Sequence, residues 1–386
     1  MKKVSILDSV NIITDTVSEY TGIRPFLSTG NLNGSIIIDN DYFEFDDKPS
    51  RANLNVKEGD IILARMQNTN KVKIITKKEE NLIVSTGFIV LRSKDVSFES
   101  YLYHLFNSSY FQNKKDRLCT GATQKAINNT NFSKISIPLP PLPQQKAIAA
   151  QLDKAQELIQ YNEQLIEKYD ELQQSLFLDM FGDPVINEKG WEIELIENIA
   201  ASKKHSIKAG PFGSALKKEF YVEKGYKVYG QEQVIKGDLS YGDYYIDENK
   251  YRELESCKVN AGDVLISLVG TYGKVAVIPE IFEKGIINPR LMKISPNIKI
   301  IRPDFLKWLL QNESVKMQLK AYSRGGTMDI INVGIVKKIE IILPPLTLQN
   351  DFAQKIESIE LQKEQAKEAL AKSKDIFQGL LQEHFF

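Results

Sequence analysis

The feature that most constrains this chain is an internal repeat at constant spacing. Residues 59–63 read GDIIL, and residues 262–266 read GDVLI, 203 positions later. The tetrapeptide LPPL at residues 139–142 returns at residues 343–346, 204 positions later. Positions between these two anchors match at an offset of 204, as Tyr101-Leu102 does with Phe305-Leu306. An offset that stays at 203 or 204 from the first anchor to the second predicts a tandem duplication of a unit of about 200 residues.

Each copy has the same predicted order of elements: a strand after a Gly-Asp turn, an amphipathic helix, a strand ended by proline, and a long charged helix. Alternating β-branched residues indicate the strands, and apolar residues spaced by three or four indicate the helices. The expected short elements are strands at Ile61–Ala64, Val264–Leu268, Ile135–Leu139 and Ile339–Leu343, and helices at 99–113 and 303–320.

After each LPPL segment, apolar residues recur at alternating spacings of four and three. Such heptads, sustained for more than four repeats, are typical of a coiled coil. The alternative is an amphipathic helix packed on its own domain, but about 37 residues form a rod of roughly 55 Å, longer than a small domain's face. Two such helices on one chain are expected to pair antiparallel. The expected core positions are Ile148, Leu152, Ile159, Ile166, Leu176, Phe352, Ile356, Ile359, Leu370, Phe377 and Leu380, with Asn162, Gln173, Lys363, Ser373 and His384 as polar positions.

Charge separates between the helices and the rest of the chain, although the totals are 50 basic and 50 acidic residues. Residues 146–180 carry three basic and seven acidic side chains, a net charge of −4, and residues 349–386 carry five and seven, a net charge of −2. The remaining residues therefore carry a net charge of +6. Acidic helices beside mildly basic globules suit a protein whose globules meet a polyanion.

Composition excludes several classes of protein. No apolar run approaches the roughly 18 residues of a membrane span, and the N-terminus turns polar at Asp8, too early for a signal peptide. The only cysteines are Cys119 and Cys257, which excludes a disulfide framework and disfavours a cysteine zinc site. We therefore expect a cytoplasmic protein without a metal.

No catalytic motif is found in the sequence. A nucleotide-driven motor would need a P-loop, and none is present. A DNA methyltransferase would need an Asn or Asp before its Pro-Pro-aromatic segment, whereas here the Pro-Pro pairs follow Leu139 and Leu343. A nuclease would need clustered carboxylates with a lysine, and Asp304 has no Glu-x-Lys at a workable distance. We therefore expect a protein that is not an enzyme and uses no cofactor.

The whole pattern resembles the specificity subunit of Type I restriction–modification systems. The resemblance rests on two globular units, each followed by an I-x-I-x-L-P-P-L strand and a long helix, and it covers essentially the whole chain. The segments that carry it are residues 135–145, 339–346, 180–184 leading into Trp191, 208–214 and 324–327. Two departures are noted: the second helix lacks a counterpart of Pro143, and the first copy lacks a counterpart of residues 211–214.

The resemblance implies an α+β fold in which two tandem globular α/β target-recognition domains are separated by two long helices forming an antiparallel coiled coil, with a pseudo-twofold internal repeat. The implied domains are residues 1–143 and 182–345, and the implied helices are residues 144–181 and 346–386. Each domain would read one half of a split, asymmetric site on double-stranded DNA, with the helices as a spacer. Two DNA adenine methyltransferase subunits and motor-nuclease restriction subunits would join the assembly.

Two alternatives remain open. One is the specificity subunit of a related system that cleaves beside its site, and the other is a coiled-coil scaffold with two peptide-binding globules. Steep weakening of binding with salt would count against the scaffold.

Candidate DNA contacts lie in loops and at strand ends, where polar side chains can reach base edges and phosphates. Each lysine could equally belong to an ordinary solvated face, and each glycine turn could simply close a loop. Arg324 is the strongest candidate, because it stands beside Gly325-Gly326 and can present a planar fork to phosphate or guanine. The candidates are Arg24, Arg65, Gln67, Thr123, Gln124, Lys125, Lys208, Ser214, Lys217, Lys218, Gln231, Gln233, Arg324 and Thr327.

Overall fold

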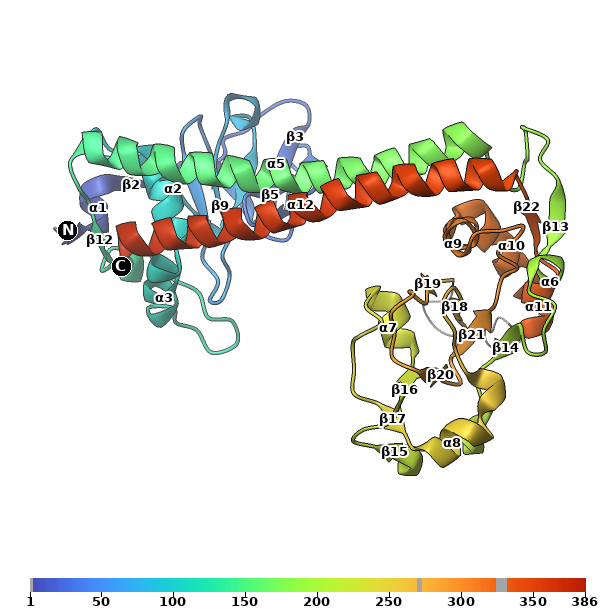
Figure 1. The fold of residues 1–386 in the computed structure, drawn as a ribbon. Helices are drawn as coiled ribbons and strands as arrows, with labels where there is room; N and C mark the ends of the chain where they lie inside the picture. The colour runs from blue at the N-terminus through green and yellow to red at the C-terminus, as the bar shows by residue number, and fades with distance from the viewer. Residues whose placement is uncertain (1–2, 269–272, 324–331) are drawn as a thin grey trace. The chain divides into compact units, whose positions relative to one another are not determined.

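The two long helices predicted from the heptads are present in the computed structural model, which describes residues 3–268, 273–323 and 332–386. Helix α5 (Leu142–Phe181) and helix α12 (Leu346–Phe385) each contain 40 residues. The chain divides into unit 1 (Met1–Ile166 with Gln365–Phe386) and unit 2 (Glu167–Glu364), so each unit holds one end of each helix together with one globule. The α+β class expected from the sequence is confirmed (Figure 1).

The globule of unit 1 contains two four-stranded sheets. One is antiparallel, with the order β2-β11-β8-β9, and the other has the order β6-β3-β10-β7, in which β3 and β10 run parallel. Two-stranded ladders join β1 to β12 and β4 to β5. The strands are β1 Lys3–Ser5, β2 Val10–Ile13, β3 Arg24–Leu27, β4 Leu32–Asn33, β5 Ile36–Ile37, β6 Asp41–Phe43, β7 Ala52–Asn55, β8 Ile61–Ala64, β9 Val72–Ile74, β10 Ile83–Ser85, β11 Phe88–Ser93 and β12 Ser136–Pro138. The helices are α1 Ile6–Ser9, α2 Glu99–Asn107, α3 Ser109–Arg117 and α4 Asn129–Phe132.

The globule of unit 2 also contains two four-stranded sheets. Its antiparallel sheet has the order β14-β21-β18-β19, and its second sheet has the order β15-β17-β16-β20 with β16 and β20 parallel. The strands are β13 Ile193–Leu195, β14 Ile207–Ala209, β15 Tyr221–Val222, β16 Tyr226–Tyr229, β17 Tyr245–Ile246, β18 Val264–Ser267, β19 Val275–Val277, β20 Gly285–Ile287, β21 Leu291–Ile294 and β22 Glu340–Ile342. The helices are α6 Ile196–Ile199, α7 Gln231–Lys236, α8 Glu248–Glu253, α9 Pro303–Gln311, α10 Glu313–Ser323 and α11 Val333–Lys337. The antiparallel sheet recurs in the same order, whereas the parallel pair lies inside the second sheet of unit 1 and at the edge of the second sheet of unit 2. The shared antiparallel sheet supports the duplication predicted from the sequence.

The two segments expected as single helices each form two helices, α2 with α3 and α9 with α10. The breaks fall at Ser108 and Asn312, whose side-chain oxygens accept hydrogen bonds from the backbone N–H groups of Phe111 and Ser314 at 3.3 and 2.9 Å. Serine and asparagine favour such caps over a helix interior. The prediction of one continuous helix was therefore wrong in both copies.

A buried glutamine fixes the start of each long helix to its globule. Gln145 is fully buried, its Oε1 accepts from Phe98 N at 2.9 Å, and its Nε2 donates to Val96 O and Pro140 O at 2.9 and 2.8 Å. Gln349 is also fully buried and makes the same three kinds of hydrogen bond to backbone groups 204 positions later. The helix starts are therefore equivalent, although the counterpart of Pro143 is missing.

Each globule's main core is completed by both long helices. In unit 1, Leu152 near the start of α5 and Phe385 at the end of α12 are buried in one cluster, and the Phe385 ring lies 5.5 Å from that of Tyr101. In unit 2, Phe181 at the end of α5 and Phe352 near the start of α12 are buried with their rings 5.2 Å apart. Burial of such aromatic side chains stabilises the attachment of each helix by several kcal/mol, on the order of 3–5 per phenylalanine.

The long helices pair antiparallel in both units, as predicted (Figure 1). In unit 1, Asn162 Nδ2 lies 3.5 Å from Ser373 Oγ. In unit 2, Gln173 Nε2 donates to Glu360 Oε1 at 2.7 Å. The residue number rises along α5 as that of its partner falls along α12, which defines the antiparallel direction.

Candidate nucleic-acid interface

In unit 1, the predicted polar side chains reach solvent in the loop of residues 119–127. The backbone groups of Thr120 and Ala126 hydrogen-bond each other in both directions at 3.0 Å, which closes the loop. Lys115 is fully buried beneath it and donates from Nζ to two carbonyl oxygens in the 66–69 segment, at 3.1 and 2.7 Å. The exposed loop side chains include Thr123, Gln124 and Lys125. The loop therefore presents a hydroxyl, an amide and a cation on a fixed base.

Three other candidates in unit 1 use their donors inside the globule. Arg24 Nε, Arg65 Nε and Gln67 Nε2 each donate to a backbone carbonyl of another segment, at 3.2, 2.9 and 3.2 Å. Burial lowers the pKa of the Arg65 guanidinium. These side chains support neighbouring loops, and only part of each remains exposed for a ligand.

In unit 2, the candidates of the 208–218 segment differ in exposure. Lys208 lies half-buried in β14, whereas Ser214, Lys217 and Lys218 are exposed. Lys217 Nζ lies 3.6 Å from Glu219 Oε1, and a surface ion pair of this kind contributes little to stability. The exposed cations are therefore available to an anion.

Lys218, Gln231 and Gln233 line a cavity of about 410 Å³ in the globule of unit 2. Gln233 is buried and its Oε1 accepts a hydrogen bond from Gly230 N at 3.0 Å, so it holds the cavity wall. Sequence reasoning missed the other residues of the wall, which come from segments far apart in the sequence. They include Tyr221, Tyr244, Asn288 and Arg290.

Two candidates cannot be placed. Arg324 and Thr327 belong to residues 324–331, which lie outside the described residues. Both stay predictions from the sequence.

The predicted apolar core positions of the long helices are all buried or half-buried. Among the apolar ones, Ile148, Leu152 and Phe352 are buried. The half-buried ones are Ile159, Ile166, Leu176, Ile356, Ile359, Leu370, Phe377 and Leu380. The polar positions Asn162, Gln173 and Ser373 are also buried, at 8, 4 and 8% exposure. Polar groups buried in such a seam favour one register over others.

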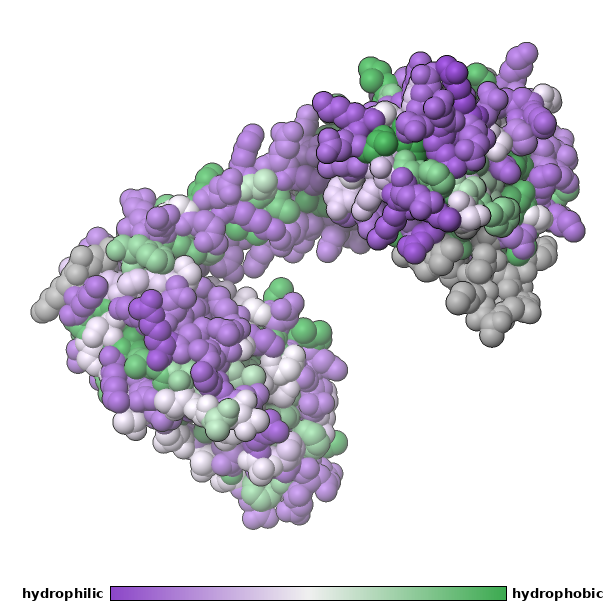
Figure 2. Space-filling model, turned by 90° about the horizontal axis from the view of Figure 1, so that it is seen from below, coloured by the Kyte–Doolittle hydropathy of each residue, from purple (hydrophilic) through white to green (hydrophobic). Residues whose placement is uncertain are grey.

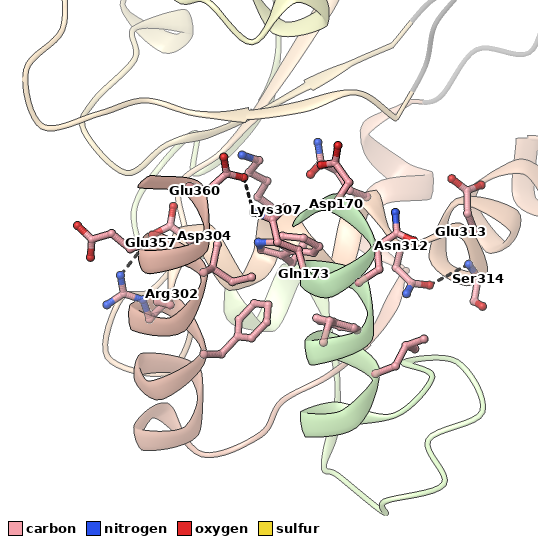
Figure 3. Close-up of a pocket in the computed structure, with 18 of the residues that line it drawn as sticks. Asp170, Gln173, Arg302, Asp304, Lys307, Asn312, Glu313, Ser314, Glu357 and Glu360 are labelled. Carbon is pink, nitrogen blue, oxygen red and sulfur yellow. Dashed lines mark hydrogen bonds and ion pairs between the residues drawn. The ribbon is translucent and has the colours of Figure 1, made fainter. Parts of the chain in front are cut away.

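A groove of about 1360 Å³ in unit 2 lies between the long helices and helices α9 and α10 (Figure 3). Phe177 and Trp308 stack in its apolar part, with ring centroids 6.2 Å apart and an interplanar angle of 16°. Its rim carries both signs of charge, including Asp304, Glu357 and Lys307 (Figure 3). A groove with an apolar floor and a rim of both charge signs is better suited to bind another protein than to bind a polyanion such as DNA.

The described residues contain neither a cluster of metal-ligating side chains nor a cysteine whose pKa is lowered. Within residues 3–268, 273–323 and 332–386, no cluster of three or more His, Cys, Asp or Glu could hold a metal ion. Burial raises the pKa of both thiols, Cys119 and Cys257, which disfavours the thiolate nucleophile.

His104 is buried and its Nε2 lies 2.7 Å from Asp153 Oδ1. Its Nδ1 has no hydrogen-bond partner among the described residues. A second N–H at Nδ1 would therefore be unsatisfied, and burial lowers the pKa of this imidazole. These contacts and the lowered pKa favour a neutral imidazole that donates from Nε2 to Asp153.

Across the described residues, no helix has the length and apolar content to span a membrane. Surface apolar residues are scattered among hydrophilic ones on the face shown in Figure 2.

Comparison with known proteins finds relatives that span both halves of the chain. The Type I restriction enzyme MjaVIII specificity subunit of Methanocaldococcus jannaschii is 25% identical over 376 residues, covering 94% of this chain and 86% of the relative. The Type I restriction enzyme EcoKI specificity subunit of Escherichia coli K12 is 22% identical over 321 residues, covering 77% of this chain and 67% of the relative.

Solved structures share the fold. The S subunit of a Type I restriction–modification system from M. genitalium aligns with a TM-score of 0.60 at 15% identity, covering 100% of this chain and 96% of that one. A chain from a study of complex assembly and conformational transition in the type I R-M system aligns with a TM-score of 0.59 at 18% identity, covering 99% and 96%. The family model for the Type I restriction modification DNA specificity domain matches residues 11–169 and 206–372, and this chain therefore belongs to that family, as the non-catalytic DNA specificity subunit of a Type I restriction–modification system.

Proposed function

We propose that the two globules read the two halves of one bipartite, asymmetric site on double-stranded DNA, and that the paired helices set the distance between them. The observation that carries this proposal is that the same antiparallel sheet recurs in two globules whose second sheets and exposed loops differ. A shared frame with different loops suits two different half-sites, because sequence is read by side chains that reach base edges from a rigid frame.

The difference between the loops supports an asymmetric site. The globule of unit 1 exposes Thr123, Gln124 and Lys125 on a loop closed by backbone hydrogen bonds. The globule of unit 2 has residues 211–214, which have no counterpart in the first copy, and a cavity of about 410 Å³ lined in part by Leu216 and Lys218. Different donors, acceptors and shapes discriminate different bases.

The helices support a defined spacing. A helix of 40 residues is about 60 Å long, which is enough to bridge half-sites one helical turn of DNA apart. Linking two weak readers raises their combined affinity through effective concentration, provided that the linker spans the gap. Polar contacts between the helices in both units favour a single register of the pair, which supports a defined spacing.

We also propose that two methyltransferase subunits and motor-nuclease subunits assemble on this chain. A specificity subunit needs separate subunits for methyl transfer and cleavage. One of the solved chains that share the fold of this protein comes from a study of complex assembly in the type I R-M system. In unit 2, the mixed-charge groove around Trp308 is the surface that best fits a protein partner.

Co-expression with its methyltransferase subunit, followed by methylome sequencing, tests the reading function. We expect a split motif with two unlike halves and a constant spacer. A contiguous motif, or no motif from an assembled and active complex, would refute the proposal.

A loop variant assigns one half-site. Lys125→Ala should relax or weaken only the half read by unit 1. Lys78→Ala removes an exposed cation from the opposite end of the β8–β9 hairpin and is the matched control, which should leave the motif unchanged. Equal effects of the two variants would mean that the 119–127 loop has no special part in reading.

A further inference from the structure

Phe212 is an aromatic side chain that is 88% exposed, and it belongs to residues 211–214, which have no counterpart in the first copy. Single exposed apolar residues are common on protein surfaces, so the exposure alone carries no inference. The way in which the loop is held, and the charges beside it, distinguish Phe212.

The N-terminal side of the loop is held by a close backbone approach. Gly210 N donates to Leu291 O at 2.9 Å. A Cβ at Gly210 would lie 1.8 Å from Asn288 O, so only glycine fits there. Pro211, which follows, is buried. Phe212 therefore starts from a fixed point on the globule.

The C-terminal side of the loop is held as well. Ala215 N donates to Phe212 O at 2.8 Å across the short turn η2 (Gly213–Ala215). Leu216 is only 7% exposed and packs in the same core cluster as Leu291. Because both flanks of the loop are anchored, the exposed ring is held in place before binding, and little conformational entropy is lost when it inserts into a partner.

Cations stand beside this apolar tip. Lys217 and Lys218 follow the loop and are exposed. Lys218 lines the 410 Å³ cavity together with Leu216 and Arg290, and Arg290 is exposed. An apolar ring flanked by cations matches a ligand with stacked apolar faces behind a row of negative charges, which is the chemistry of duplex DNA.

We propose that Phe212 inserts as an apolar wedge between two stacked base pairs of the half-site read by unit 2, while Lys217, Lys218 and Arg290 contact flanking phosphates. The inference rests on the proposed function, in which unit 2 reads duplex DNA. Apolar side chains used in this way partly unstack a base step and bend the duplex. Since the first copy has no counterpart of residues 211–214, the distortion occurs in one half-site only.

The test uses the complex with its methyltransferase subunits and duplexes that carry the motif found by methylome sequencing. Adenine is replaced by 2-aminopurine at one position at a time, because its fluorescence rises when the base is unstacked. We expect a several-fold rise at one step of one half-site with the wild-type chain and no rise with Phe212→Ala. The variant should bind about 5- to 150-fold more weakly, the effect expected for loss of one base–aromatic contact.

Two controls separate the outcomes. Ile281→Ala removes another highly exposed apolar side chain of unit 2 (94% exposed) and should change neither the fluorescence nor the affinity. Phe212→Leu keeps an apolar wedge and should retain most of the signal. A mismatch at the identified step should strengthen wild-type binding, because unstacking is already partly accomplished there, and should have little effect on Phe212→Ala.

Three results would overturn the wedge. They are sequence-specific binding by Phe212→Ala with wild-type affinity, no position in either half-site whose fluorescence depends on Phe212, and loss of methyltransferase assembly as the only defect of the variant. Failure of the proposed function has a different signature, since the wild-type complex would then show no preference for any bipartite sequence.

Discussion

Lengthening both long helices by one heptad should lengthen the DNA spacer. Seven residues inserted after Ile166 in α5 and seven after Lys367 in α12 lie between the same two contacts, Asn162 with Ser373 and Gln173 with Glu360. Both polar contacts and the apolar seam are therefore preserved. The insertion leaves unit 1 and unit 2 intact, because it falls near the boundary between them.

The expected change follows from helix and DNA geometry. Seven residues add about 10.5 Å of helix and turn it through about 700°, only about 20° short of two full turns. The duplex rises about 3.4 Å per base pair, so the spacer should grow by up to about three base pairs if the helices run along the DNA. Methylome sequencing of a host that carries the variant complex reads the new spacer directly, and both half-sites should keep their bases.

An insertion in α5 alone is the control. It leaves one of the two polar contacts out of register, and each buried polar group without a partner costs about 1–3 kcal/mol. We expect a less stable chain and weak or no methylation. An assembled double-insertion complex that methylates the original spacer would refute the ruler, as would a single insertion that shifts the spacer equally well.

Three further predictions concern single residues. Phe385→Ala should destabilise unit 1 by roughly 3–5 kcal/mol, because this ring is 3% exposed in the core of that unit. Hydrogen exchange should show the loss in unit 1 and not in unit 2, and Phe181→Ala should show the reverse. Since burial lowers the pKa of His104, the unfolded chain takes up a proton that the folded chain refuses, and stability should fall as pH drops through about 6.5. His104→Gln should flatten this part of the curve of melting temperature against pH, and an unchanged curve would contradict the assignment. Arg324→Ala should weaken one half-site only, and equal losses on all sequences in salt-dependent binding assays would mark Arg324 as a phosphate contact.

The architecture could be predicted from the sequence because two independent signals agreed. Because of the repeat, each short sequence pattern occurs twice, and the second copy supports the interpretation of the first. The heptads distinguished long paired helices from ordinary amphipathic helices. The breaks at Ser108 and Asn312 were missed although both copies place a capping residue at the equivalent position. The presence of a capping residue at the equivalent position of both copies could have predicted the two helix starts.

The candidate site was harder to predict, because a sequence does not show which groups a polar side chain hydrogen-bonds in the folded protein. Arg65 and Gln233 have the chemistry of DNA contacts, yet their donors and acceptors are engaged inside the globules. Conversely, Asn288 and Arg290 lie beside a turn that no sequence motif marks, and the fold brings them to the cavity lined by Lys218. Such convergence depends on strand order, which the repeat alone does not specify.

The cores explain why the helices pair antiparallel. The helix of the first copy ends in Phe177 and Phe181, which are buried in the core of unit 2. The equivalent end of the second copy's helix, Leu381 and Phe385, is buried in the core of unit 1. Each copy therefore completes the other's core with its helix end, and a parallel pairing would leave both ends without their cores. The heptads alone permit either direction. The aromatic ends and the polar contacts between the helices select one, and they thereby attach two globules with different loops to a single pair of helices.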